Sequence, residues 1–226
     1  MSPVLDARLE AAFGLIAAPG GAVHADIGSD HARLPIALVR RGDVRACLIV
    51  EKTAGPCEVA RREVRRAGLT ERIEVRLGDG FSPIFPQEVH SASLTGLGAR
   101  TILGILNRAG SALPAQLVLQ PNDTTGQLRA WASSHGYHLT DERLAPGFWT
   151  YTVLKLERSS GSDPAYQGLP EDVAQAWGPH LLRRQDPLLL AQLRAQHARL
   201  TEVTPHGRAA VRRDLELIER TLRLWA

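Results

Sequence analysis

The chain has 226 residues, 44% of them hydrophobic and 23% charged, which is enough for one substantial core and a smaller appendage. No stretch approaches the roughly 18 to 20 apolar residues of a membrane span, and the N-terminus lacks the basic and apolar segments of a secretion signal. Two cysteines are too few for a disulfide framework or a metal site. We therefore expect a cytoplasmic protein without a metal, and the formal charge of +3 identifies no partner.

Helices and strands alternate along the first two thirds of the chain. Apolar spacing predicts helices over residues 5–16, 34–41, 55–67 and 124–135, and strands over residues 22–26, 46–50, 73–77, 91–95 and 116–119. Two further stretches, 137–143 and 149–156, predict a closing hairpin. Such alternation is typical of a mostly parallel sheet with helices on both faces, so we expect an α/β fold with an antiparallel final strand.

The composition changes at the polar segment 158–164, which we interpret as a linker between a first domain (1–158) and a second (159–226). Beyond it the pattern is helical. Spacings of four and three, as in a coiled-coil seam, relate Val211, Leu215, Ile218, Leu222 and Trp225, and an opposing stripe comes from Leu182, Leu189, Leu193 and Leu200. With a turn at 204–207, this predicts an antiparallel helical hairpin whose first helix Pro179 and Pro187 break or delay.

The segment Asp26-Ile27-Gly28-Ser29-Asp30-His31 carries the strongest functional signal. It follows the first strand, where ligands bind in open α/β sheets. A dinucleotide needs the glycine pattern G-x-G-x-x-G there, but only Gly28 is present and the acids repel phosphate. Asp26 and Asp30 instead favour a cation with hydroxyls and an amine, which describes S-adenosylmethionine. Asp30 could alternatively cap the next helix, whereas Asp26, at the end of a buried strand, needs a partner.

Two more acids follow strand ends. Glu51 ends the second strand, 25 residues after Asp26, where an acid of nucleotide-binding folds accepts hydrogen bonds from ribose hydroxyls. Asp79 follows the third strand and could accept from an adenine amine, while Gly78 and Gly80 let the backbone lie against the ring. A purely structural origin for the three acids is the alternative, but chance seldom places acids at three successive strand ends. The pattern predicts a methyltransferase that binds S-adenosylmethionine.

The ends of the fourth and fifth strands are predicted to receive the methyl acceptor. Residues 95–99 (Thr-Gly-Leu-Gly-Ala) offer exposed backbone and space for a flat base. Residues 120–122 (Gln-Pro-Asn) add amides that could contact a base edge. The alternative is that the glycines only permit a tight turn.

Together these motifs resemble the bacterial tRNA adenine-22 N1-methyltransferase family. The resemblance is carried by residues 26–32 with Leu34-Pro35, by Glu51, by Gly55-Pro56, by residues 78–80 and 119–122, and by Gly178-Pro179 before the helical tail. The chain departs from the family at Ala99, where such proteins usually carry glycine and where the methyl group is expected to narrow the space for the base. It also departs at Arg33, where they carry an aromatic residue.

The resemblance implies a Rossmann-like class I methyltransferase sheet with a C-terminal helical domain, and methyl transfer to N1 of adenine 22 in tRNA. Because N1 is paired in helical RNA, the target base must be exposed or flipped. For the cofactor, the implied site residues are Asp26, Gly28, Ser29, His31, Glu51, Lys52, Asp79, Gly80 and Gly96. For catalysis and base recognition they are Asp30 and Asn122.

Arginines are expected to contact the phosphates of the RNA. The candidates are the helical run Arg61, Arg62, Arg65 and Arg66 and the C-terminal Arg183, Arg184, Arg194, Arg199, Arg208, Arg212, Arg213, Arg220 and Arg223. Acids lie among them, so a solvated helical surface is the alternative. A small-molecule methyltransferase and an RNA-binding relative without activity are the rival functions, the latter suggested by Ala99. The oligomeric state stays open, with a monomer as the expectation.

Overall fold

The computed structural model describes residues 3–16, 21–29, 31–203 and 209–225. It divides the chain into two compact units, Met1–Asp163 and Pro164–Ala226, and the predicted linker spans the point of division. None of the described helices is long and apolar enough to cross a membrane.

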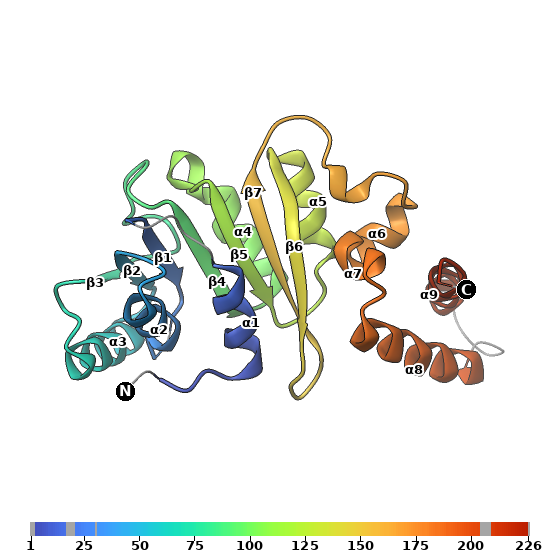
Figure 1. Ribbon diagram of the computed structural model, residues 1–226, viewed down its shortest axis with the longest axis horizontal. Coiled ribbons are helices and arrows are strands. Elements are labelled where there is room, and N and C mark those ends of the chain that lie inside the picture. Colours follow the sequence, from blue (N-terminus) through green and yellow to red (C-terminus); the bar gives the residue numbers. More distant parts are fainter. Residues whose placement is uncertain (1–2, 17–20, 30, 204–208, 226) are drawn as a thin grey trace. The chain divides into compact units, whose positions relative to one another are not determined.

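The first unit is built on a sheet that has seven strands in the described part of the chain, in the order β3-β2-β1-β4-β5-β7-β6 (Figure 1). The strands are β1 (Val23–Ile27), β2 (Ala46–Glu51), β3 (Ile73–Leu77), β4 (Ser91–Leu97), β5 (Gln116–Pro121), β6 (Tyr137–Ala145) and β7 (Tyr151–Arg158). The first five are parallel, and β7 lies antiparallel between β5 and β6. The predicted α/β class and antiparallel final strand are confirmed.

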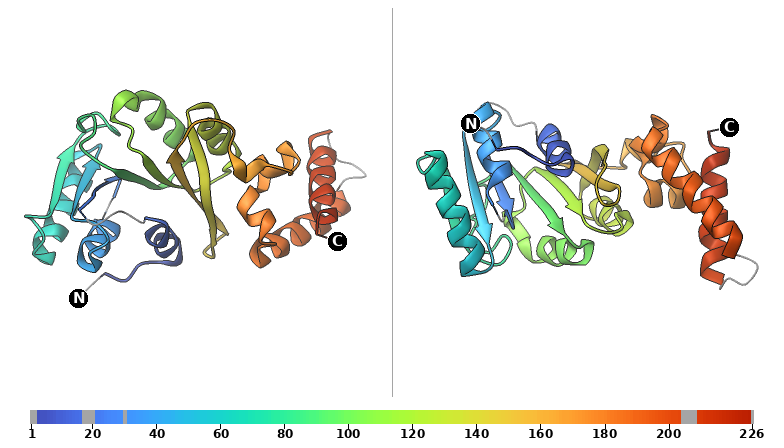
Figure 2. Two further views of the ribbon diagram at one scale, coloured as in Figure 1. Left: turned by 45° about the horizontal axis from the view of Figure 1, so that its top comes forward. Right: turned by 90° about the horizontal axis from the view of Figure 1, so that it is seen from below.

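Helices cover both faces of this sheet, as parallel crossover connections require. The views in Figures 1 and 2 place α1 (Ala7–Leu15), α2 (Arg33–Arg41) and α3 (Ala54–Ala67) on one face, and α4 (Ala99–Ala109) and α5 (Gly126–Ser134) on the other. Helix α4 is not among the predicted helices. Its buried residues Ile102, Ile105 and Leu106 recur at helical spacing, which is the sequence signal for it.

The order of the strands reverses between β1 and β4. From β1 the chain builds outward through β2 and β3, and it then returns to the other side of β1 to add β4 and β5. At such a reversal the loops leave in opposite directions, which opens a crevice beyond the carboxyl ends of the two strands. The crevice is therefore expected beside residues 28 and 97.

The second unit is helical. It contains α6 (Glu171–Trp177), α7 (Pro179–Arg183), α8 (Pro187–Val203) and α9 (Ala209–Arg223). Proline begins α7 and α8, as expected from its fixed φ and missing N–H. α8 packs against α9, with Leu189, Leu193 and Ile218 buried. Leu182 lies in α7, where its carbonyl accepts a hydrogen bond of 3.0 Å from Trp225 Nε1, and the predicted turn at 204–207 lies outside the described residues.

Candidate functional site

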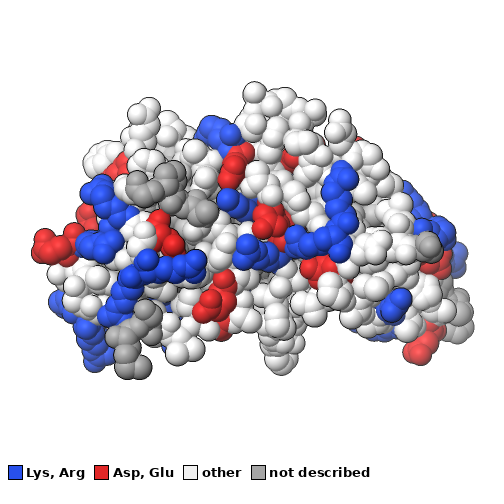
Figure 3. Space-filling view, viewed as in Figure 1, with Lys and Arg blue, Asp and Glu red and all other residues white. Residues whose placement is uncertain are grey.

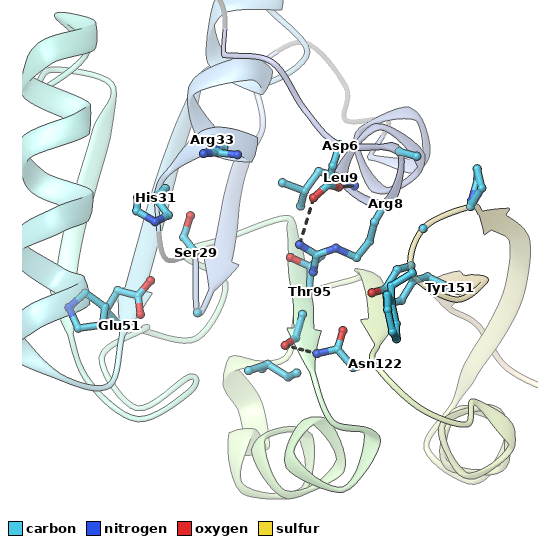
Figure 4. A pocket seen from close by; sticks show the side chains of 18 residues that line it. Asp6, Arg8, Leu9, Ser29, His31, Arg33, Glu51, Thr95, Asn122 and Tyr151 are labelled. Carbon is cyan, nitrogen blue, oxygen red and sulfur yellow. Dashed lines mark hydrogen bonds and ion pairs between the residues drawn. The ribbon is translucent and has the colours of Figure 1, made fainter.

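A cleft of about 780 Å³ opens at the carboxyl ends of the central strands (Figure 4). Its walls come from the start of α1, the turn after β1, the end of β2, the ends of β4 and β5, and the loop between β6 and β7. This volume is typical of a small-molecule site, and the position is the one that the reversal of strand order predicts.

The turn after β1 forms one wall. Gly28 has a φ of +77°, which a side chain would oppose, and its N–H donates to Val50 O at 2.9 Å. Ser29 and His31 line the cleft. Ser29 Oγ is buried, and it lies close enough to the Asp26 carboxylate for a hydrogen bond from Ser29 to lower the pKa of that group.

The capping alternative for Asp30 at the start of α2 stays a prediction. The N-cap position of that helix is Ala32, with a φ of 54° and no side-chain hydrogen bond to the helix. Asp30 itself lies outside the described residues.

Asp26 does not line the cleft but lies beneath the turn, 2% exposed. Ser93 Oγ donates to Asp26 Oδ1 at 2.5 Å, and the two ring nitrogens of His24 lie 2.8 Å from Ser93 Oγ and from Ser91 Oγ. Burial lowers the pKa of His24 to about 3, so its ring is neutral. Because the Ser93 hydroxyl donates its hydrogen bond to Asp26, its oxygen accepts from His24 Nε2–H. The other ring nitrogen, His24 Nδ1, then accepts from the Ser91 hydroxyl. Burial also raises the pKa of Asp26.

Glu51 lines the cleft. The β1–β2 register pairs Ile27 with Val50, which brings Glu51 alongside Gly28. The residue is only 6% exposed, and Figure 4 shows its carboxylate on the same side of the cleft as Ser29 and His31. A buried carboxylate facing a cavity is suited to accept hydrogen bonds from the hydroxyls of a ligand.

Lys52, Asp79 and Gly80 do not line the cleft. Lys52 Nζ lies 3.0 Å from Asp79 Oδ2, and Arg108 also pairs with Asp79, at 3.5 Å. A Cβ at Gly80 would lie 2.7 Å from Ile105 Cγ2, so packing against α4 already requires this glycine. Of the predicted cofactor residues, Gly28, Ser29, His31, Glu51 and Gly96 line the cleft.

The opposite wall is held together by amides. Gln120 Oε1 accepts from Gly96 N–H and from Arg8 Nη1, both at 2.9 Å. Asn122, which lines the cleft, donates from Nδ2 to Gly96 O at 2.7 Å, so its Oδ1 is left for a ligand. Ala99 is 4% exposed and does not line the cleft. Its methyl group therefore does not narrow the acceptor space.

The sequence analysis does not identify Asp6, Arg8, Phe148 and Tyr151 as site residues, although all four line the cleft. Arg8 pairs with Asp6 at 3.5 Å, and its guanidinium lies 6.0 Å from the centre of the Tyr151 ring. Figure 4 shows Arg8, Asn122 and Tyr151 at the opposite end of the cleft from Glu51. Helix α1 and the β6–β7 loop are far apart in the sequence, and no local motif relates them.

The predicted phosphate-binding arginines fall into two groups. Arg61, Arg62 and Arg66 pair with Glu58 or Glu63 of their own helix, which favours the solvated-surface alternative there. Of the C-terminal set, ion pairs or backbone hydrogen bonds hold Arg183, Arg184, Arg220 and Arg223. Figure 3 shows basic and acidic side chains intermixed on the face in view.

Four arginines of α8 and α9 are exposed and form no ion pair with a described residue: Arg194, Arg199, Arg212 and Arg213. Arg208 lies outside the described residues. Among the residues that the structure describes, no group of three or more His, Cys, Asp or Glu could hold a metal ion.

Comparison with known proteins agrees with this geometry. Residues 24–222 match the family model TrmK, described as tRNA (adenine(22)-N(1))-methyltransferase. The chain belongs to this family. The tRNA (adenine(22)-N(1))-methyltransferase of Bacillus subtilis (strain 168) is 35% identical over 175 residues, which cover 76% of this chain and 73% of the relative.

Two solved structures extend the likeness over the whole fold. The crystal structure of the B. subtilis M1A22 tRNA methyltransferase TrmK has a TM-score of 0.81 and 31% identity, and the match covers 98% of this chain and 97% of that one. A Streptococcus pneumoniae protein of this kind, in complex with S-adenosyl-L-methionine, has a TM-score of 0.84 and 29% identity over 97% of this chain and 100% of that one. The family resemblance expected from the motifs is confirmed.

Proposed function

We propose that this chain is an S-adenosylmethionine-dependent methyltransferase that methylates N1 of adenine 22 in tRNA. The observation that carries the proposal is the family match over residues 24–222. This range includes all the strands that contribute to the cleft and leaves out only Val23, the first residue of β1. The cleft lies at the reversal of strand order and combines a buried carboxylate, Glu51, with a buried hydroxyl, Ser29 Oγ.

The end of the cleft formed by the turn after β1 and by Glu51 is proposed to hold the cofactor, which supplies an activated methyl group when bound. Glu51 would accept hydrogen bonds from the ribose hydroxyls, and Ser29, which lines the same wall, would contact the ligand beside it. Asp26 would act from below, because its hydrogen bond from Ser93 fixes the end of β1 and its charge lies near the positively charged ligand. The roles of His31, Lys52, Asp79 and Gly80 stay predictions.

The other end is proposed to hold the target adenine. Neutral N1 has a lone pair in the plane of the ring, so the chain has mainly to align the base and exclude water. Asn122 Oδ1 would accept from the adenine amine, since Nδ2 of the same amide is engaged by Gly96 O. Asp30 is proposed to lie near the acceptor and to favour the cationic product.

The exposed arginines of α8 and α9 are proposed to contact tRNA phosphates. Arg194, Arg199, Arg212 and Arg213 form no ion pair with a described residue, so binding phosphate would break no existing pair. From the sequence we further propose that the chain acts in the cytoplasm and as a monomer.

Methyl transfer to defined RNA tests the proposed function. The purified chain is incubated with labelled S-adenosylmethionine and with a tRNA transcript that carries adenine 22, and the product is digested and mapped. We expect one N1-methyladenosine at position 22 and none in a transcript with guanosine there. Tight cofactor binding without transfer to any tRNA would contradict the proposal and favour the inactive relative, and transfer to a small acceptor alone would favour the other rival.

A further inference from the structure

The loop between β6 and β7 exposes two large aromatic side chains. Phe148 is 90% exposed and Trp149 is 53% exposed, and their rings meet edge to face with centres 4.8 Å apart. An exposed phenylalanine contributes little to folding and favours aggregation, so a pair of such rings on one short loop points to a binding role.

The same loop belongs to the acceptor end of the cleft. Pro146, Gly147 and Phe148 line the cleft together with Tyr151, the first residue of β7. β7 is antiparallel to β5, with Leu154 opposite Leu119, so the start of β7 lies at the carboxyl end of β5, where Asn122 follows. The exposed rings are therefore at the mouth of the space proposed for the adenine.

The base of this loop is tightly packed. A Cβ at Gly147 would lie 2.6 Å from Tyr151 Cε2, so no side chain fits there. The Trp149 ring lies 6.2 Å from the ring of Tyr151, which in turn lies beside Arg8. The base of the loop therefore packs against Tyr151, the first residue of β7, and its aromatic residues project from that contact.

An RNA strand fits this mouth chemically. Arg8 and Arg33 line the cleft, and Arg33 is exposed without an ion pair to a described residue, so a phosphate can approach. When the target adenine leaves its helix, the adjacent base loses a stacking partner, and an inserted side chain can take that place. With 90% of its surface in solvent, Phe148 is suited to a base that stays outside the cleft rather than to one enclosed by it.

We propose that Phe148, supported by Trp149, stacks on a nucleobase that flanks the methylated adenine and so holds the opened RNA strand at the mouth of the cleft. This inference rests on the proposed function. It assigns a positioning role to a loop for which the sequence analysis predicts only a hairpin.

Steady-state kinetics with tRNA test the inference. Phe148→Ala is expected to lower kcat/KM for tRNA by about 10-fold to 100-fold, mainly through KM, because stacking of one base on an aromatic ring is worth this much. KM for S-adenosylmethionine should not change. Phe148→Trp, which keeps a flat ring, should restore activity, whereas Phe148→Leu, which keeps only apolar area, should not.

Phe85→Ala is the matched control, because Phe85 is also a solvent-exposed phenylalanine, 71% exposed, but does not line the cleft. It should leave tRNA kinetics unchanged. Thermal melting should show nearly the same midpoint for all variants, since both phenylalanine rings are largely exposed to solvent. Equal kcat/KM for Phe148→Ala and the unaltered chain, or full activity of Phe148→Leu, would overturn the inference. So would a changed sedimentation coefficient with unchanged tRNA kinetics, which would make the loop a contact between copies of the chain. If the unaltered chain fails to methylate tRNA, the proposed function fails instead.

Discussion

The two ends of the cleft differ in how the chain builds them. The end at Glu51 and Ser29 is made of residues that directly follow or end neighbouring parallel strands, with a buried chain of hydrogen bonds from Asp26 to Ser91 below it. The end at Arg8, Asn122 and Tyr151 is assembled from three distant segments and is more exposed to solvent. The first end can be predicted from local motifs, while the second depends on the completed fold.

The largest expected effect tests whether the two ends have separate tasks. Asp30→Ala should lower kcat by at least about 100-fold, the range seen when one electrostatic contact to a developing charge is removed. Affinity for S-adenosylmethionine, measured by calorimetry, should fall much less. Asp30→Asn, which keeps the size, should show the same separation. An equal loss in both quantities would assign Asp30 to the cofactor end.

A second prediction concerns the cofactor end alone. Glu51→Gln keeps the volume and removes the charge, and it should weaken S-adenosylmethionine binding by about 10-fold to 100-fold, the worth of charged hydrogen bonds. KM for tRNA should stay the same. Asp79→Asn is the comparison, because Asp79 pairs with Lys52 and Arg108 outside the cleft. A larger loss of affinity from Asp79→Asn than from Glu51→Gln would move the cofactor site away from Glu51.

Much of the cofactor end could be predicted because its geometry follows from neighbouring strands. Gly28 and Ser29 directly follow β1 and Glu51 is the last residue of β2, and parallel strands bring their carboxyl ends to one edge. The antiparallel β7 could also be predicted locally, because residues 137–143 and 149–156 show the pattern of a hairpin. Asp26, however, was expected to meet the cofactor directly and is instead covered by the turn, because the residue that reaches the cavity depends on where the strand stops.

The acceptor end could not be predicted in the same way. Arg8 reaches the cleft only because α1 packs on the sheet beside β5 and β7, and nothing in residues 5–16 beyond their helical spacing indicates that contact. Tyr151 and Phe148 reach it through the antiparallel pairing of β7 with β5. Ala99 was expected to narrow this end, but the first turn of α4 points its methyl group into the core.

A third prediction tests the buried support of the cofactor end by pH. The unfolded chain binds a proton at His24 below its ordinary pKa of 6.5, whereas the folded chain does so only near a pKa of about 3. Stability should therefore fall as the pH is lowered from 6.5, by up to about 1.4 kcal/mol per pH unit from this residue. Asp26 opposes this trend near and above its ordinary pKa of 3.8, because burial raises its pKa in the folded chain.

Urea unfolding at several pH values, compared between the unaltered chain and His24→Gln, isolates the histidine contribution. The variant should lose less stability on acidification than the unaltered chain. Parallel curves for the two proteins would mean that His24 takes up its proton at a similar pH in the folded and unfolded chain, so that both of its ring nitrogens donate, to Ser91 and to Ser93.

The smallest expected effect is at the acceptor end. Arg8→Ala removes the hydrogen bond to Gln120 and the contact with Tyr151, and it should lower kcat/KM for tRNA by roughly 5-fold to 10-fold, the worth of about one hydrogen bond. Cofactor affinity should be unchanged. Arg61→Ala, which removes an exposed arginine paired with Glu58 on α3, is the control. A loss of cofactor affinity in Arg8→Ala would show that the two ends are not independent.

The side chain of Lys52 stays exposed although it forms an ion pair with Asp79. Lys52 and Lys155 are the lysines of the sequence, and their side chains are 71% and 16% exposed, with Lys155 held at 3.0 Å from Glu157. Of the two lysine amines, that of Lys52 is thus the more accessible to an acylating reagent, and it directly follows the residue that ends β2. A fluorophore attached there would report occupancy of the neighbouring cavity without an engineered cysteine.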